Sequence, residues 1–202
     1  MGRTKEFNTD EALEVAMRVF WKNGDEATSM ENLEEAMKLK RTSIYNAFGN
    51  KRKLYQSVLD RYLNTILSRF AVVLKQADSA QEAIEGVFRA IIDHNFSFDN
   101  PGGCLVVLSV MENQQHDEST RRMLEDILQG LSHAVIKRLK QGVVEGELKP
   151  DTPVRRIGEQ VTAMLNGITV MAKAHFPERH LRELAEASTD TLLKNYVVGP
   201  KK

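Results

Sequence analysis

The sequence has little of what builds disulfide-bonded or membrane-spanning proteins. It contains one cysteine, Cys104, in 202 residues, which excludes an intrachain disulfide framework and suits a reducing compartment. Its longest nearly unbroken apolar run, from Cys104 to Met111, is far shorter than the ~20 residues that cross a bilayer. No apolar stretch follows the first six residues. We therefore expect no signal peptide, no membrane partner and a cytoplasmic location.

Strand signals are also scarce. Alternating β-branched segments bounded by two-residue turns are nearly absent, whereas apolar residues recur at spacings of three and four. All five prolines fall where helices should break. The sequence therefore predicts an all-α protein of about nine helices. The expected helices are Thr9–Asn23, Thr28–Met37, Arg41–Phe48, Lys51–Ala77, Ala80–Phe98, Gly102–Asn113, Asp117–Glu145, Thr152–Phe176 and Arg179–Tyr196.

The chain lacks an excess of either charge. The 28 Lys and Arg residues balance the 28 Asp and Glu residues, which argues against a histone-like polycation but leaves local patches open. Such a patch exists, because nine acidic and two basic residues lie between Glu6 and Glu35, whereas residues 36–59 carry six bases and no acid. The bases flank the expected helix Arg41–Phe48, whose hydrogen-bonding side chains include Thr42, Ser43, Tyr45 and Asn46.

Two short helices joined by a tight turn, the second cationic and polar, are typical of a helix-turn-helix DNA-binding unit. Thr28 and Glu31 have the spacing of a capping box that starts the first of the two helices. The second helix is expected to enter the major groove, while the lysine and arginine side chains that flank it bind DNA phosphates. The alternative is that the basic run is only a solvated surface. We expect a helix-turn-helix DNA-binding domain over residues 1–50 and a ligand-binding and dimerisation domain over residues 51–202. The expected core of the first domain is Phe20, Leu33, Leu39, Ile44, Phe48 and Leu54.

Within this region, residues 28–33, Leu39 and residues 42–51 resemble the DNA-binding segment of TetR-family transcriptional regulators. The spacing of Tyr45, Phe48 and Lys51 is the most specific part of the resemblance. The resemblance covers about residues 9–60, and the rest of the chain is similar in length and helical layout. Residues 102–107, which contain Cys104, also resemble a motif found in one branch of that family.

The resemblance implies a homodimeric repressor that binds double-stranded DNA at a palindromic operator. It also implies an unknown small-molecule effector, which binds the C-terminal domain and weakens operator binding. By position, Ser29 and Lys51 are expected to hold phosphates, while Tyr45 and Asn46 contact the DNA backbone. The residues expected to face base edges or nearby backbone are Arg41, Thr42 and Ser43. Arg3 and Lys5 are a possible arm along the DNA.

Three positions depart from the family pattern. Lys38 lies where the family usually has Gly, Lys40 where it has Ser, and Asp25 where it has an aromatic residue. Lys38 must then accept a turn geometry that favours Gly, at a cost of roughly 1 kcal/mol. Lys40 cannot cap the following helix as Ser does. Both lysines add positive charge beside the groove, so we count Lys40 among the DNA-binding residues.

The C-terminal domain offers candidate effector-binding residues. They are Phe88, Ile92, Phe96, Cys104, Val107, Met111, Met123 and Met164. Methionines suit a tolerant pocket, although at helical spacing the alternative is plain core. His94 is a further pocket candidate, with a core or rim histidine as the alternative. Trp21 is expected to be core or nearly so.

Cys104 carries the sharpest secondary hypothesis. If it lies in the first turn of a helix, its thiol pKa falls and the thiol can react with oxidants or electrophiles. The alternative is a small apolar residue that fills a tight space. None of the five histidines pairs at a spacing of three or four, so neither a metal site nor another cofactor is expected. No catalytic motif is recognisable, and an enzyme is not expected.

We expect the last two helices to form the dimer face. The side chains assigned to it are Val161, Leu165, Ile168, Leu184, Ala187, Leu192 and Leu193. Burying these stripes in a two-fold four-helix arrangement would hide them from water. The alternative to a repressor is a helical ligand-binding or interaction protein that has lost specific DNA binding.

Overall fold

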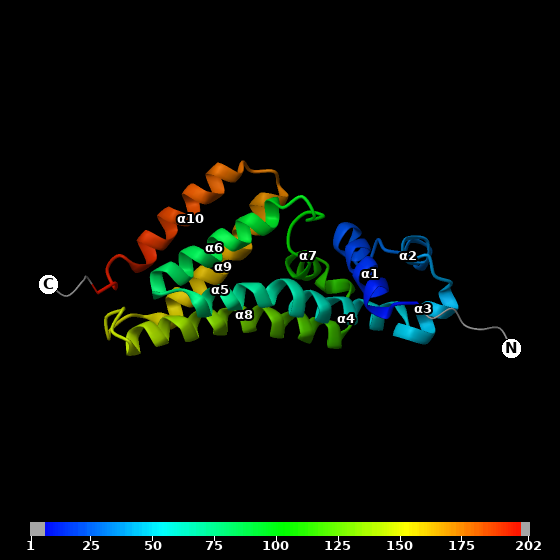
Figure 1. Ribbon diagram of the computed structural model, residues 1–202, viewed down its shortest axis with the longest axis horizontal. Helices are drawn as coiled ribbons and strands as arrows, with labels where there is room; N and C mark the ends of the chain where they lie inside the picture. The colour runs from blue at the N-terminus through cyan, green and yellow to red at the C-terminus, as the bar shows by residue number, and fades with distance from the viewer. Residues whose placement is uncertain (1–6, 199–202) are drawn as a thin grey trace.

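The computed structural model describes residues 7–198, and in that range the chain is built from helices. They are α1 (Thr9–Asn23), α2 (Met30–Met37), α3 (Arg41–Phe48), α4 (Lys51–Tyr62), the π-helical turn η1 (Leu63–Leu67), α5 (Ser68–Gln76), α6 (Ala80–Phe96), α7 (Leu105–Met111), the 3-10 turn η2 (Asn113–Gln115), α8 (Glu118–Val144), α9 (Val154–Lys173) and α10 (Glu178–Leu193). Figure 1 shows α1–α3 at one end of an elongated molecule, with α8 alongside the rod of α4 and α5. The expected all-α fold is confirmed.

The long helix expected over Lys51–Ala77 is present as a single rod with a wider turn in its middle. Helix α4 runs directly into η1, and η1 into α5, without an extended residue between them. The π-helical turn carries no fully buried side chain. Such turns leave no clear trace in apolar spacing, so the sequence did not reveal it.

The start of α2 differs from the sequence prediction. The capping residue is Ser29, whose hydroxyl accepts a hydrogen bond from the amide of Asn32, 3.2 Å away. Asn32 reciprocates by accepting from the Ser29 amide at 2.9 Å. The capping box predicted from Thr28 and Glu31 is therefore wrong by one residue. Thr28 is buried and donates instead to the main-chain oxygen of Gly24, at 2.6 Å.

Two apolar clusters form the interior. The first joins α1–α4 to α7 and the first half of α8, and it contains Phe20, Leu33, Ile44 and Leu54, all at 0% exposure. Leu39 and Phe48 pack against this cluster, so the six predicted core residues are confirmed. The second cluster joins α5, α6, α9, α10 and the far half of α8. The expected boundary at residue 50 falls between α3 and α4, whereas the first cluster extends across it into α7 and α8.

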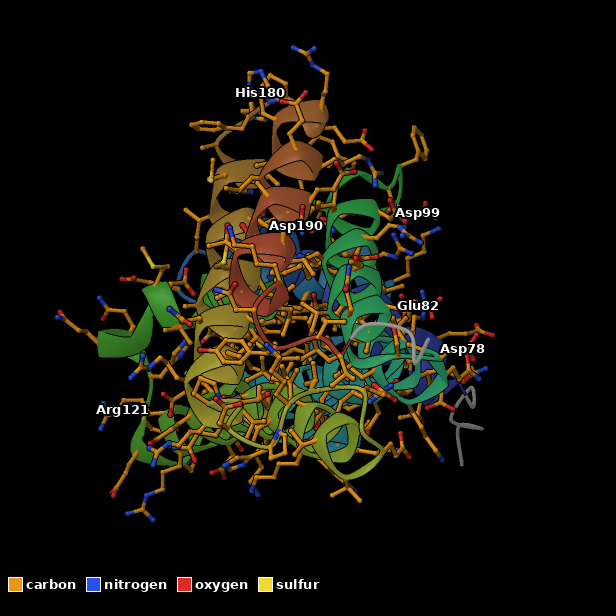
Figure 2. All side chains as sticks on the ribbon, turned by 90° about the vertical axis from the view of Figure 1, so that its left-hand side faces the viewer. Asp78, Glu82, Asp99, Arg121, His180 and Asp190 are labelled. Carbon is orange, nitrogen blue, oxygen red and sulfur yellow. The ribbon has the colours of Figure 1, made fainter. Side chains whose placement is uncertain are left out.

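The residues predicted for the dimer face are mostly interior. Val161, Leu165, Ile168 and Leu193 are buried in the protomer's own core, because the apolar stripes of α9 and α10 face α6 and α8. That part of the prediction is wrong. The outward surface of these two helices carries other small and apolar side chains, which are Ala163, Gly167, Val170, Leu184 and Ala187. Figure 2 shows α10 on the outside of the molecule, between α6 and α9, with His180 near its beginning and Asp190 near its end.

No helix within residues 7–198 combines the length and the hydropathy needed to span a lipid bilayer.

Candidate nucleic-acid interface

Helix α3 presents one polar face to solvent. Thr42, Tyr45 and Asn46 are all exposed, and their spacing of three and four residues places them on the same side of the helix. Ile44, on the opposite side, is fully buried, and Ser43 is half-buried. Of the side chains predicted to face base edges or backbone, three thus form a continuous exposed strip.

The turn before α3 follows the expectation for Lys38. This residue adopts the left-handed conformation, with φ of 54° and ψ of 36°, and its amide donates to the main-chain oxygen of Glu34. A residue with a Cβ is strained there by roughly 1 kcal/mol. Lys38 and Lys40 are both exposed, so the unusual lysines add charge beside the α3 face.

Lys40 precedes α3 without a side-chain capping bond, as expected. Helix α3 nevertheless begins at Arg41, because a side chain from α2 supplies an acceptor. Glu34 accepts from the Arg41 amide at 3.3 Å and from the Arg41 Nε at 2.6 Å. The carboxylate of α2 therefore stabilises the start of α3.

Arg41 is engaged inside the helix-turn-helix. Its guanidinium pairs with Glu31 as well as Glu34. Backbone hydrogen bonding at Glu31, followed by the bond from Arg41, lowers the pKa of the Glu31 carboxyl to about 2. The two carboxylates also raise the pKa of Arg41 above its usual value. The guanidinium predicted to read DNA is therefore held by α2 in this conformation.

Lys51 is engaged in the same way. Its Nζ lies 3.2 Å from a carboxylate oxygen of Asp25 and donates to the main-chain oxygen of that residue. Arg52 pairs with Asp117 at 2.9 Å, whereas Lys53 is exposed. The sequence analysis counted Lys53 in the basic run but did not name it as a candidate phosphate contact. Its place in the first turn of α4, next to Lys51, is the sequence signal for such a role.

Ser29 is exposed, and its hydroxyl caps α2. Arg3 and Lys5 lie outside the described residues.

The eight predicted effector residues do not line one cavity. Cys104 and Val107 border a narrow internal cavity of about 30 Å³, together with Leu67, Ile127 and Leu165. Met123 lies in a groove of about 690 Å³ between the α4–α5 rod and α8. Phe88 and Ile92 border a cleft of about 360 Å³ between α6 and α10. Phe96 and Met111 are exposed, and Met164 packs against the second apolar cluster.

Cys104 does not have the environment of a reactive thiol. It precedes α7 as the residue at the helix boundary, and it is buried. Burial raises the pKa of the Cys104 thiol, and hydrogen bonds from Tyr62 and the α7 amides oppose this only in part. The predicted lowering of its pKa is therefore wrong, because desolvation outweighs the helix start. The alternative, a small side chain in a tight apolar space, fits the structure.

His94, on α6, contacts both α1 and α4, and it borders none of the three cavities described above. Its ring stacks on Trp21, with centroids 5.5 Å apart, and its Nε2 lies 3.3 Å from the hydroxyl of Tyr62. Burial, followed by the charge of Arg69, lowers the pKa of His94 to about 4. Trp21 is buried, as predicted. Within residues 7–198, no three potential metal ligands gather into a site.

Comparison with known proteins agrees with this geometry. Residues 12–58 match the family described as bacterial regulatory proteins, tetR family, and residues 80–188 match the tetracyclin repressor-like C-terminal domain. The chain is 30% identical over 190 residues to the HTH-type transcriptional repressor ComR of Escherichia coli (strain K12), covering 91% of this chain and 88% of ComR. It is 26% identical over 196 residues to the uncharacterized HTH-type transcriptional regulator YezE of Bacillus subtilis (strain 168), covering 95% of this chain and 100% of YezE.

Solved structures extend the similarity to the whole fold. A cysteine mutant of the TetR family transcriptional regulator CifR, complexed with 26bp double-strand operator DNA, is 31% identical with a TM-score of 0.90, covering 95% of this chain and 100% of CifR. The reduced form of NemR from E. coli shares the fold, with a TM-score of 0.81 at 15% identity over 96% of this chain and 98% of NemR. The chain belongs to the TetR family of transcriptional regulators.

Proposed function

We propose that this regulator is a repressor that binds a palindromic operator as a homodimer and changes its DNA affinity when a small molecule binds. The observation that carries the proposal is the exposed strip of Thr42, Tyr45 and Asn46 on α3, flanked by Lys38 and Lys40. A helix of this kind fits the major groove, where its polar side chains meet base edges and the lysines meet phosphates. The operator complex of the relative CifR supports a DNA partner. Because that partner is DNA, the expected location is the cytoplasm.

The proposed DNA-contacting residues fall into two groups: side chains that are exposed, and side chains that are held in ion pairs within the chain. Thr42, Tyr45 and Asn46 are free to reach bases or backbone, with Ser43 at the edge of the strip. Ser29 and Lys40 are positioned for phosphates. Arg41 and Lys51 must first leave, or share, the carboxylates that hold them. Their contribution to binding is therefore reduced by the cost of separating these ion pairs.

The dimer is proposed to form through the outward surface of α9 and α10. Val170 and Leu184 are 51% and 37% exposed, and Ala163, Gly167 and Ala187 leave room for a close approach of helices. A two-fold axis beside this surface pairs each helix with its copy. Two helix-turn-helix units related by that axis require a palindromic operator.

The effector response is proposed to be a population shift. The internal cavity beside Cys104, at about 30 Å³, is too small for an organic effector, whereas the groove between α5 and α8, at about 690 Å³, is in the usual range of ligand sites. Both are bordered by Leu67, Ile127 and Leu131. A ligand that separates α5 from α8 would move the rod that begins at Lys51. It weakens DNA binding only if it binds the non-DNA conformation more tightly.

The test is selection of binding sites from a random double-stranded DNA pool at about 150 mM salt, where non-specific binding is weak. Enrichment of one palindrome is the expected result. Asn46→Ala should then weaken binding to that palindrome, whereas Gln141→Ala, a change at an exposed position of α8, should not.

A folded dimer that enriches no sequence would instead favour a helical ligand-binding or interaction protein. One observation favours this second function: Arg41 and Lys51, two expected DNA contacts, are paired with carboxylates of the chain itself.

A further inference from the structure

The groove between the α4–α5 rod and α8 has two different ends. Two contacts fix how the rod and α8 are aligned along it. Near the DNA-binding helices, Gln56 of α4 donates to the hydroxyl of Thr120 at 3.0 Å. Far from them, Arg138 of α8 donates at 3.4 Å to the main-chain oxygen of Ala77, just after α5. The two walls of the groove therefore run in the same direction, so sequence position gives the place of a residue along it (Figure 1).

The middle and the far end of the groove are apolar. The lining residues there are Leu67, Ala71 and Leu74 on the rod and Ile127, Leu131 and Ala134 on α8. Gly130 also borders the groove, and beyond its own helix backbone a Cβ added to it would meet no heavy atom within 4 Å. This part of the groove is therefore open to an apolar chain, whose burial there is favourable.

The end near the DNA-binding helices is acidic. Asp60 of α4 and Asp126 of α8 border the groove from opposite walls, and both are exposed. Counted from the contact of Gln56 with Thr120, the two residues differ by only about 3 Å in their position along the helix axes. Within residues 7–198, neither carboxylate takes part in an ion pair or a side-chain hydrogen bond. Two carboxylates therefore face one short section of the groove.

The lining supplies no free base to balance this acidic end. Arg122 is the basic residue among the described residues of the lining, and it is paired with Glu118 on its own helix. Asp60 and Asp126 therefore attract a cation and repel an anion. Because both are exposed, the attraction is modest, and it selects the charge of the ligand while the apolar part supplies most of the affinity.

We propose that the groove binds a cationic amphiphile, a small molecule with an amine or quaternary ammonium head and a long apolar tail. The head lies between Asp60 and Asp126, and the tail extends over the apolar part toward Leu74. Asp60 and Leu74 are 14 positions apart, which is about 21 Å along a helical rod, so the groove suits an extended chain. This inference names the ligand class of the effector site, and in that respect it rests on the proposed function.

The first test compares three probes with the same alkyl chain, which are dodecyltrimethylammonium, dodecanol and dodecanoate. Each is added below its micelle concentration to the full chain without DNA, and binding is measured by equilibrium dialysis. The cationic probe should bind most tightly and the anionic probe most weakly. Asp126→Asn should weaken the cationic probe by about threefold, the size expected for one exposed charge pair, and leave dodecanol unchanged. Equal binding of the three probes to the wild type would overturn the cationic class.

Glu125→Gln is the matched control for this charge. Glu125 precedes Asp126 on α8 and is exposed, but it borders a different hollow and not the groove. This variant should bind dodecyltrimethylammonium as the wild type does. An equal loss in Glu125→Gln and Asp126→Asn would mean that the net charge of the chain attracts the probe, and the placement of the head would be wrong.

The second test locates the tail. Gly130→Leu puts a side chain into the open part of the groove, and leucine is the better helix former, so the fold should be kept. Binding of both dodecyltrimethylammonium and dodecanol should fall about tenfold or more, the effect of losing the burial of about two methylene groups. Gln129→Leu adds the same side chain at an exposed neighbour outside the groove lining and should bind as the wild type does. If Gly130→Leu keeps its probe binding, or changes the oligomeric state instead, the groove is not the ligand site and the proposal is overturned.

Operator binding separates this inference from the proposed function. With the palindrome obtained by selection, saturating dodecyltrimethylammonium should weaken DNA binding by about fivefold or more, the smaller end of coupling between linked sites. If the probe binds the groove but operator affinity does not change, the ligand class stands and the proposed effector response is wrong. If dodecanol binds as tightly and releases DNA equally, the effector site stands and the cationic class is wrong. Failure of all three probes to bind would overturn the inference, whatever the selection yields.

Discussion

The indole nitrogen of Trp21 donates a hydrogen bond to the main-chain oxygen of Gly103, 2.9 Å away. This bond joins α1 of the DNA-binding helices to the loop that leads into α7. The Trp21 ring also packs edge-on against Tyr62, with centroids 4.9 Å apart. Buried contacts therefore connect Trp21 of α1 both to the loop before α7 and to α4.

Replacing Trp21 with Phe should test this connection. The change keeps an aromatic ring but leaves the buried Gly103 carbonyl without its donor, which costs about 1–3 kcal/mol. We expect a lower free energy of unfolding in urea and a weaker effect of any inducer on operator affinity. The control is Phe70→Leu, which removes a ring from α5 without touching this hydrogen bond. Equal loss of inducer response in both variants would mean that the bond has no special role in coupling.

Releasing Arg41 should strengthen DNA binding. Glu34→Gln removes the charge that holds the guanidinium, while its amide oxygen can still accept from the Arg41 amide at the start of α3. We expect tighter binding and a steeper dependence of affinity on salt, by about one phosphate contact. Glu35→Gln is the matched control, because this exposed residue on the same helix has no bond to Arg41 among the described contacts. If both variants gain equally, general electrostatics is the cause and not the release of Arg41.

Lys38→Gly should stabilise the fold. Lys38 is left-handed at φ of 54°, and glycine adopts that conformation without the Cβ penalty, a gain of up to about 1 kcal/mol before its greater freedom in the unfolded chain is subtracted. Lys40→Gly provides the comparison, since Lys40 is extended with φ of −73° and should gain nothing. Denaturant unfolding of the two variants measures the difference. DNA affinity should fall in both, because each loses one positive charge. A Lys38→Gly chain no more stable than Lys40→Gly would contradict the argument.

Cys104 should react slowly in the folded protein. Its thiol is buried and its pKa is raised, so little thiolate is available to an alkylating reagent near neutral pH. Alkylation followed by mass spectrometry should be much faster in urea than in buffer. Operator binding by Cys104→Ser should respond to oxidants as the wild type does. Fast alkylation of the native chain, or loss of an oxidant response in Cys104→Ser, would restore the sensing hypothesis.

Much of the fold could be predicted because helices leave a periodic trace. The bounds of α1 and α3 agree with the approximate ranges expected, since Gly24 and Gly49 mark where these two helices end. The proposed dimer surface could not be predicted, because the strongest apolar stripe of α9 faces the chain's own core. The opposite surface is made of small residues such as Ala163 and Gly167, which carry little apolar signal.

The exposed polar strip on α3 could be predicted from the sequence, whereas the ion pairs of its charged neighbours could not. The sequence alone gives no sign that the side chains of Arg41 and Lys51 have partners. In the structure, each is paired with a carboxylate from another segment. Such pairs depend on how α2 and the α1–α2 turn are placed in space. The same reason hid the contact between Asp25 and His116, which are 91 positions apart. Electrostatic partners far apart in sequence require tertiary structure before they can be recognised.

His94 should make the stability of the fold depend on pH. The pKa of His94 falls to about 4 in the folded chain, below the value of about 6.5 for an unperturbed histidine. The unfolded chain therefore binds this proton first, so His94 makes the fold less stable as the pH falls from about 6.5 toward 4. The loss is on the order of 1–2 kcal/mol once partial solvent exposure is allowed for.

This contribution can be measured by unfolding the wild type and His94→Gln in urea from about pH 4.5 to about pH 8, a range that includes the ordinary histidine pKa of about 6.5. Relative to the wild type, His94→Gln should gain stability as the pH falls below about 6.5, because glutamine has no proton to take up on unfolding. The change of this stability difference with pH is the decisive quantity, since overpacking or cavity effects of the substitution shift the whole curve without changing its slope. A stability difference between His94→Gln and the wild type that stays constant with pH would mean that the pKa of His94 is not lowered in the folded chain.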